Sequence, residues 1–154
     1  MLRLHLITIS VILVALVAHQ GTFAEDISEK VKGPIQVTSD TLTADKIART
    51  MLFEHNVIAR SQDMTLYADK MVVTYKKETG DVSVIEATGS VKLNKDTQLI
   101  TAQTATYYAD EDKVVFSGNP RALDGENVVT GTRMIYFISD DRTYVENSSV
   151  YLKE

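Results

Sequence analysis

Apolar and polar positions along this chain fall in short runs without helical spacing, and one stretch shows the pattern clearly. Ile100–Tyr108 is rich in Thr, Tyr and small residues, and the acidic segment Ala109–Lys113 interrupts the apolar pattern after it. Val114–Ala122 is a second apolar run that contains the turn sequence Ser117–Pro120. This composition is typical of half-buried strands joined by polar turns. Residues 100–122 therefore predict a β-hairpin.

The same pattern occurs four times. The copies begin at Val37, Leu66, Ile100 and Val129, with spacings of 29, 34 and 29 residues. In each copy a small residue follows two positions later, and further apolar residues follow five and seven positions after the start. Because strand side chains alternate faces with a period of two, moving from the second to the fifth position changes face unless the strand bends. We therefore predict a built-in bend in the opening strand of every copy.

Each copy then returns through a second predicted strand. The matching positions in these return strands are Phe53, Ala87, Phe116 and Val145. Two residues later a second turn is marked by His55, Gly89, Gly118 and Asn147. Four bent hairpins in series predict an all-β fold, and the pattern alone fits an open barrel, a jelly roll or a short β-solenoid.

The beginning of the chain has a different composition. Arg3 provides a positive charge, Leu6–Val17 is an apolar run, and Thr22 and Ala24 are small residues before Glu25. This arrangement predicts a signal peptide over residues 1–24 that is cleaved between Ala24 and Glu25. The apolar run is short for a membrane span, which needs about 20 residues, although an uncleaved anchor remains the alternative. The remaining chain divides into a flexible arm over 25–33 and one β domain over 34–152.

Composition narrows the chemistry that the chain can perform. There is no Cys and there are three His, and the net charge is −5. A thiolate metal site and a His-based triad are therefore not expected, and an acidic chain without a basic run argues against nucleic acid. The carboxylates of Asp110–Asp112 and Asp140–Asp141 lie in predicted turns, where Asp is favoured for the backbone it adopts. We expect no catalytic residues, no metal site and no cofactor.

The repeats instead place a set of apolar side chains on one face. These inward residues are Ile35, Val37, Leu42, Phe53, Val57, Leu66, Met71, Val73, Ile85, Val91, Ile100, Tyr107, Phe116, Val129, Met134, Tyr136 and Ile138. The repeated small position, held by Ser39, Ala68, Ala102 and Gly131, would leave a lengthwise trough if it faced inward. From the pattern alone the set fits a filled core better than the lining of a groove.

Four motifs carry a resemblance to a known family. Pro34–Leu42, Leu66–Thr74, Val114–Pro120 and the repeat at Gly131 resemble the periplasmic lipopolysaccharide-transport bridge proteins, the LptA/OstA family. The resemblance extends over most of the chain after the leader. His55 departs from it, because the family usually has Gly in that return strand.

The resemblance implies a bent antiparallel β-jelly roll with a lengthwise apolar groove, and a periplasmic location. It implies that the inward residues, apart from Val91, bind the lipid A acyl chains of lipopolysaccharide, and that the protein is a carrier and not an enzyme. It further implies end-to-end stacking, with edges at Val37, Thr38, Val145 and Val150. The implied partners are inner-membrane LptC- or LptF-type domains and an outer-membrane LptD-type domain. A membrane-anchored LptC-like partner and a glycan-binding envelope β-sandwich remain the alternatives.

Overall fold

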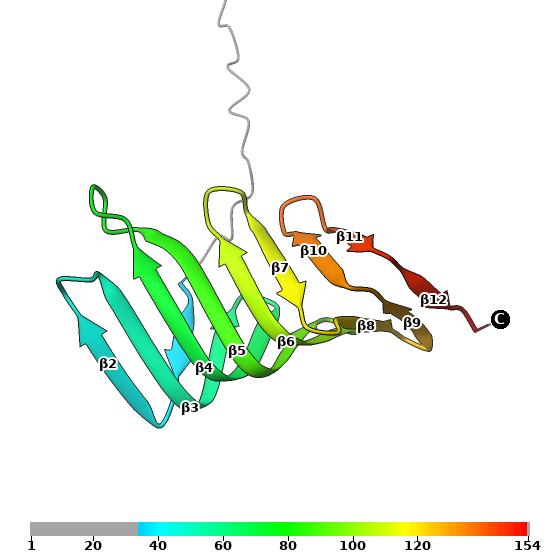
Figure 1. Cartoon of the computed structure of the whole chain (residues 1–154), viewed down its shortest axis with the longest axis horizontal. Coiled ribbons are helices and arrows are strands. Elements are labelled where there is room, and N and C mark those ends of the chain that lie inside the picture. The colour runs from blue at the N-terminus through cyan, green and yellow to red at the C-terminus, as the bar shows by residue number, and fades with distance from the viewer. Residues whose placement is uncertain (1–33, 154) are drawn as a thin grey trace, which may run out of the picture.

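Twelve strands form one antiparallel sheet in the computed structural model, which describes residues 34–153 (Figure 1). The strands are β1 Gln36–Thr38, β2 Thr41–Asp45, β3 Thr50–Ser61, β4 Met64–Tyr75, β5 Val82–Lys95, β6 Gln98–Tyr108, β7 Lys113–Ser117, β8 Arg121–Asp124, β9 Asn127–Thr130, β10 Arg133–Phe137, β11 Arg142–Glu146 and β12 Ser149–Tyr151. The predicted leader over 1–24 and arm over 25–33 lie outside the described residues.

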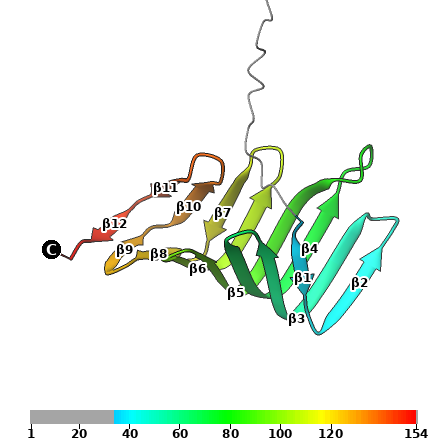
Figure 2. The same cartoon turned by 180° about the vertical axis from the view of Figure 1, so that it is seen from behind.

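The sheet is folded over on itself along a crease that crosses every strand. The long strands β3 to β6 run through the crease, whereas β1–β2, β7–β8, β9–β10 and β11–β12 are each interrupted at it. One layer contains β2, β7, β10 and β11, and the other contains β1, β8, β9 and β12, as the front view (Figure 1) and the rear view (Figure 2) show. Eight bent strands are therefore arranged as four successive hairpins. This arrangement confirms the predicted all-β, bent antiparallel fold.

The crease is built from residues in the left-handed backbone region. On the return strands these are His55 and Asn56, Gly89 and Ser90, Gly118 and Asn119, and Asn147, with φ between 49° and 80°. Ladder pairing shifts register at the same places, between Glu54 and Val57 in β3 and between Thr88 and Val91 in β5. Such bulges bend a strand and re-aim its side chains. The predicted bend and the predicted second turn are both observed.

Polar side chains from the opening strands lie against these bends. A Cβ built on Gly89 would meet Asp69 Oδ2 at 2.3 Å, and a Cβ on Gly118 would meet Gln103 Cβ at 2.5 Å. In the first copy Asn56 Nδ2 instead donates to Asp40 Oδ2 at 2.8 Å, and His55 occupies the position that Gly holds in two other copies. Glycine at positions 89 and 118 thus leaves room for the close approach and adopts a positive φ without strain.

Inside the fold, the pairing register aligns apolar residues into rows that run across the strands. One row in the β2–β11 layer is Leu42, Phe53, Met71, Ala87, Ala105, Phe116, Met134 and Val145. The facing row in the β1–β12 layer is Val37, Ala59, Leu66, Leu93, Ile100, Ala122, Val129 and Val150. Both rows extend from the first edge of the sheet to the last.

Candidate functional site

Two chambers lie between the layers. The N-terminal chamber has a volume of about 90 Å³, and its walls include Ile35, Leu66, Met71, Ile85, Tyr107 and Ile138. The C-terminal chamber has a volume of about 410 Å³, and its walls include Ile100, Ala122, Leu123, Val129, Val145 and Val150. The N-terminal chamber is lined mainly by apolar side chains, which suits a hydrocarbon ligand. The C-terminal chamber combines its apolar residues with polar ones, which are Gln98, Asp124, Asn127, Thr143 and Ser148.

The residues predicted to bind lipid are distributed over the core, the chambers and the open edge. Those that are buried are Phe53, Val57, Met71, Val73, Ile100, Phe116, Met134 and Tyr136. Those that are half-buried around this core are Val37, Leu66, Ile85, Tyr107, Val129 and Ile138. Ile35 and Leu42 are 37% and 55% exposed. Leu42 pairs with Phe53 in the inner row but belongs to edge strand β2, so it has no neighbour on its outer side.

The small residues at the repeated position lie beside the crease. Ala68 is buried and pairs with Val57 directly after the bend of β3, and a Cβ on Gly131 would meet Val145 Cγ1 at 2.4 Å. Neither Ala68 nor Ala102 lines one of the two chambers. Small side chains at this position therefore permit close packing at the crease, and the hollow part of the fold lies farther out.

Sequence reasoning missed the alanines at the floor of the N-terminal chamber. Ala87 and Ala105 pair directly across β5 and β6, are each 2% exposed, and both line this chamber. Ala87 occupies the same position in its repeat as Phe53 and Phe116 do in theirs. This equivalence indicates a side chain that faces inward. The pattern could not show that two alanines from adjacent strands would meet.

Three polar side chains connect the two layers between the chambers. Lys95 Nζ lies 2.7 Å from Asp141 Oδ1, and Tyr136 Oη donates to the same oxygen at 2.8 Å. Lys95 Nζ also lies 5.6 Å from the centroid of the Tyr136 ring. Lys95 ends β5 in the β1–β12 layer, whereas Tyr136 and Asp141 belong to β10 and the turn after it. We call these three residues the interlayer clasp.

The clasp is partly shielded from water, and Lys95 and Asp141 in it carry opposite charges. The Lys95 side chain is 19% exposed, whereas that of Asp141 is 61% exposed. The Lys95 ammonium, followed by the Tyr136 hydroxyl, lowers the pKa of Asp141, and burial is the main cause that raises the pKa of Tyr136. A space of about 10 Å³ remains beside the clasp, lined by residues that also border each chamber, such as Leu93 and Ile100.

Within 34–153 no three His, Asp or Glu side chains are grouped so that they could hold a metal ion. No helix in that same part of the chain is long and apolar enough to cross a membrane.

Comparison with known proteins connects this geometry to a family. The family model for the "LptA/(LptD N-terminal domain) LPS transport protein" matches residues 36–142, which is most of the folded sheet. The chain belongs to this family. The family is one of lipopolysaccharide transport proteins.

Two similar proteins extend the comparison. The crystal structure of LptH, the LptA homologous periplasmic component of the conserved lipopolysaccharide transport device from Pseudomonas aeruginosa, matches with a TM-score of 0.72 at 12% identity. That match covers 81% of this chain and 99% of LptH, and it shows the jelly-roll fold. The uncharacterized protein RP507 of Rickettsia prowazekii (strain Madrid E) is 25% identical over 108 residues, which are 68% of this chain and 74% of RP507.

Proposed function

We propose that this protein carries lipopolysaccharide across the periplasm by holding the lipid A acyl chains between its two layers. The observation that carries the proposal is the pair of apolar rows that run from the first edge of the sheet to the last. Both rows pass the chambers, so the chambers belong to one lengthwise apolar groove. Such a groove would hand lipid from the inner membrane towards the outer membrane without covalent chemistry.

The energetics explain why a lipid needs such a carrier. Each methylene removed from water contributes roughly 0.8 kcal/mol, so one acyl chain of about a dozen carbons costs on the order of 10 kcal/mol to expose. A lipid with several chains therefore crosses water very slowly unless its chains stay covered. Movement along the groove needs energy from another component.

Both ends of the sheet fit end-to-end association. In the described chain β1 and β2 pair only with β3, while β11 pairs only with β10 and β12 only with β9. The residues predicted as oligomer edges lie on these strands, with Val37 and Thr38 on β1, Val145 on β11 and Val150 on β12. Unpaired edges accept a further strand by backbone hydrogen bonding. A second copy, or a related jelly-roll domain of an LptC, LptF or LptD type, would extend the two apolar rows across the junction.

The state of the leader distinguishes the carrier from a membrane-anchored partner of the same pathway. Cleavage after Ala24 would release the protein, whereas an uncleaved leader would hold it in the membrane. Intact mass of the exported protein separates the two products. Retention of the leader in the membrane fraction would support the anchored partner.

Native mass spectrometry of the protein purified from its own envelope tests the proposed carrier. We expect a bound lipid whose fragments include lipid A acyl chains. A matched measurement with a fluorescent acyl probe should show saturable uptake that purified lipid A displaces. Absence of both the bound lipid and probe uptake would contradict the proposal and favour a filled core.

A further inference from the structure

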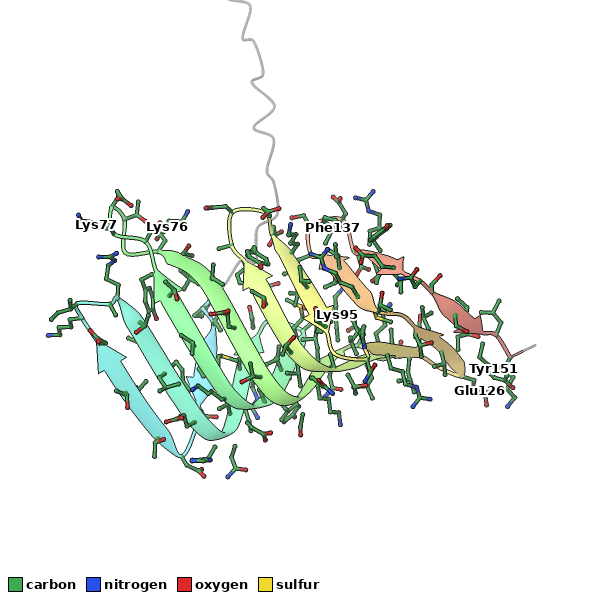
Figure 3. The ribbon with its side chains drawn as sticks, in the orientation of Figure 1. Lys76, Lys77, Lys95, Glu126, Phe137 and Tyr151 are labelled. Carbon is green, nitrogen blue, oxygen red and sulfur yellow. The ribbon has the colours of Figure 1, made fainter. Side chains whose placement is uncertain are left out.

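The interlayer clasp brings two hydrogen-bond donors to one anionic oxygen between the two layers of the sheet. The Lys95 ammonium and the Tyr136 hydroxyl both contact Asp141 Oδ1, at 2.7 and 2.8 Å. These donors come from different layers, so they converge across the groove and not along one strand. An oxyanion bound between them would hold a ligand at the boundary of the two chambers. Figure 3 places Lys95 in the middle of the molecule, well away from Glu126 and Tyr151 at the C-terminal end.

We propose that Lys95 and Tyr136 form a phosphate-binding site for the headgroup of the lipid in the groove, and that Asp141 occupies this site until the lipid displaces it. The inference rests on the proposed function, because the acyl chains must enter the groove for the headgroup to reach Lys95. The ligand class is a phosphate monoester attached to an acylated body. The phosphates of lipid A and of phosphatidic acid share this chemistry.

Because Asp141 is much more exposed than Lys95, replacement of Asp141 by a phosphate at Lys95 is favourable. Asp141 is largely exposed, so its carboxylate recovers water when it leaves Lys95. Lys95 is mostly shielded, and a shielded ammonium needs a counter-charge. A phosphate offers more negative charge and more acceptor oxygens than one carboxylate. The Asp141 side chain therefore keeps the site paired when empty and gives way to a stronger anion.

The position of the clasp fits a headgroup that has chains on either side. Leu93 is shared with the N-terminal chamber and Ile100 with the C-terminal chamber, and both border the small space next to Lys95. A headgroup phosphate held at Lys95 would therefore leave the acyl chains free to enter the chamber on either side.

The test compares lipids that share acyl chains and differ in phosphate. Wild type, Lys95→Met and Asp141→Asn are titrated with hexa-acylated lipid A and with the same lipid after removal of its phosphates. Met keeps an unbranched apolar stem beside Tyr136 and removes the charge. Loss of a charged hydrogen bond should weaken binding of phosphorylated lipid A by Lys95→Met about 10- to 100-fold. Binding of the dephosphorylated lipid should stay unchanged, and Asp141→Asn should tighten binding of the phosphorylated lipid alone.

Lys113→Met is a matched control on the outer face. Lys113 is also 19% exposed, pairs with Glu111 and lies 5.4 Å from the Tyr108 ring, but its neighbour Val114 is the residue that faces the groove. This variant should bind both lipids as the wild type does. Phosphatidic acid and phosphatidylcholine of equal chain length form a second pair. A dependence on Lys95 for phosphatidic acid as well would support a phosphate site that accepts either source.

The outcomes separate this inference from the carrier itself. If the wild type binds both forms of lipid A equally and neither Lys95→Met nor Asp141→Asn changes that, the phosphate site is overturned and the carrier stands. If the wild type binds no acylated lipid, the carrier is contradicted. Equal weakening by Lys95→Met and Lys113→Met would also overturn the site, because it would show a general effect of charge.

Discussion

Replacement of Ala105 by Leu tests whether the N-terminal chamber is part of a lipid-binding groove. Ala105 lies opposite Ala87 in the inner row, with Phe116 on its other side. Its side chain is buried at the floor of the chamber. Ala105→Leu adds three carbon atoms that point into this space, so the substitution fills the place where we expect an acyl chain.

The magnitude of the effect differs between an open and a filled interior. If the chamber of about 90 Å³ receives the new side chain, three additional buried carbons contribute roughly 0.8 kcal/mol each, or about 2 kcal/mol of stabilisation at most. If the interior were already filled, overpacking would cost about 1–3 kcal/mol. We expect the unfolding free energy of the lipid-free protein to stay level or rise, and binding of an acyl probe to fall at least about tenfold.

Urea unfolding and probe titration measured on the same preparations check this expectation. Thr106→Leu provides the control, because residue 106 neighbours residue 105 on β6 and faces the opposite side of the sheet. The control should bind the probe normally. Clear destabilisation of Ala105→Leu in the absence of lipid would refute the reasoning, and so would unchanged probe binding in a stably folded variant.

Three further results are expected. Gly89→Ala should destabilise the fold by about 1–3 kcal/mol in urea unfolding, because the new Cβ meets Asp69 and φ is +80°; pairing it with Asp69→Gly should recover part of the loss. In a carbon NMR titration the Asp141 carboxyl should titrate below its ordinary pKa and move up towards it in Lys95→Met, because Lys95 lowers the pKa of the folded state; the stabilisation is present at neutral pH and is lost as the pH falls through the folded-state pKa. Val150→Lys should keep the protein monomeric in sedimentation at concentrations where the wild type associates, because Val150 is 53% exposed on an edge strand.

The repeated local pattern was sufficient to predict the bends. The change of face between the second and fifth positions of each copy predicted a bend in the opening strand, and the structure places the residues of positive φ, including Gly89 and Gly118, at the predicted second turn of the return strand beside it. These features depend on neighbouring residues in one hairpin. Periodicity and turn chemistry therefore carry them in the sequence.

The interior of the groove could not be predicted in the same way. Ala87 meets Ala105, and Lys95 meets Asp141 across the layers, only after the whole sheet has paired and folded over. In the sequence strand alternation places Lys95 on the face of Val91 and Leu93, but no local signal shows that Asp141 reaches it from the other layer. The exposure of Leu42 likewise depends on which strand forms the edge.

The crease has a mechanical consequence for the range of cargo. Because β3 to β6 pass through the crease, they form a hinge that joins the two layers, and each layer keeps its own ladder of backbone hydrogen bonds. The layers can open about this hinge without breaking ladder hydrogen bonds, whereas a closed barrel must break such bonds to widen. In the proposed carrier the capacity of the groove would then be set by the angle between the layers, so a single protein would accommodate lipids that differ in the number and length of their chains.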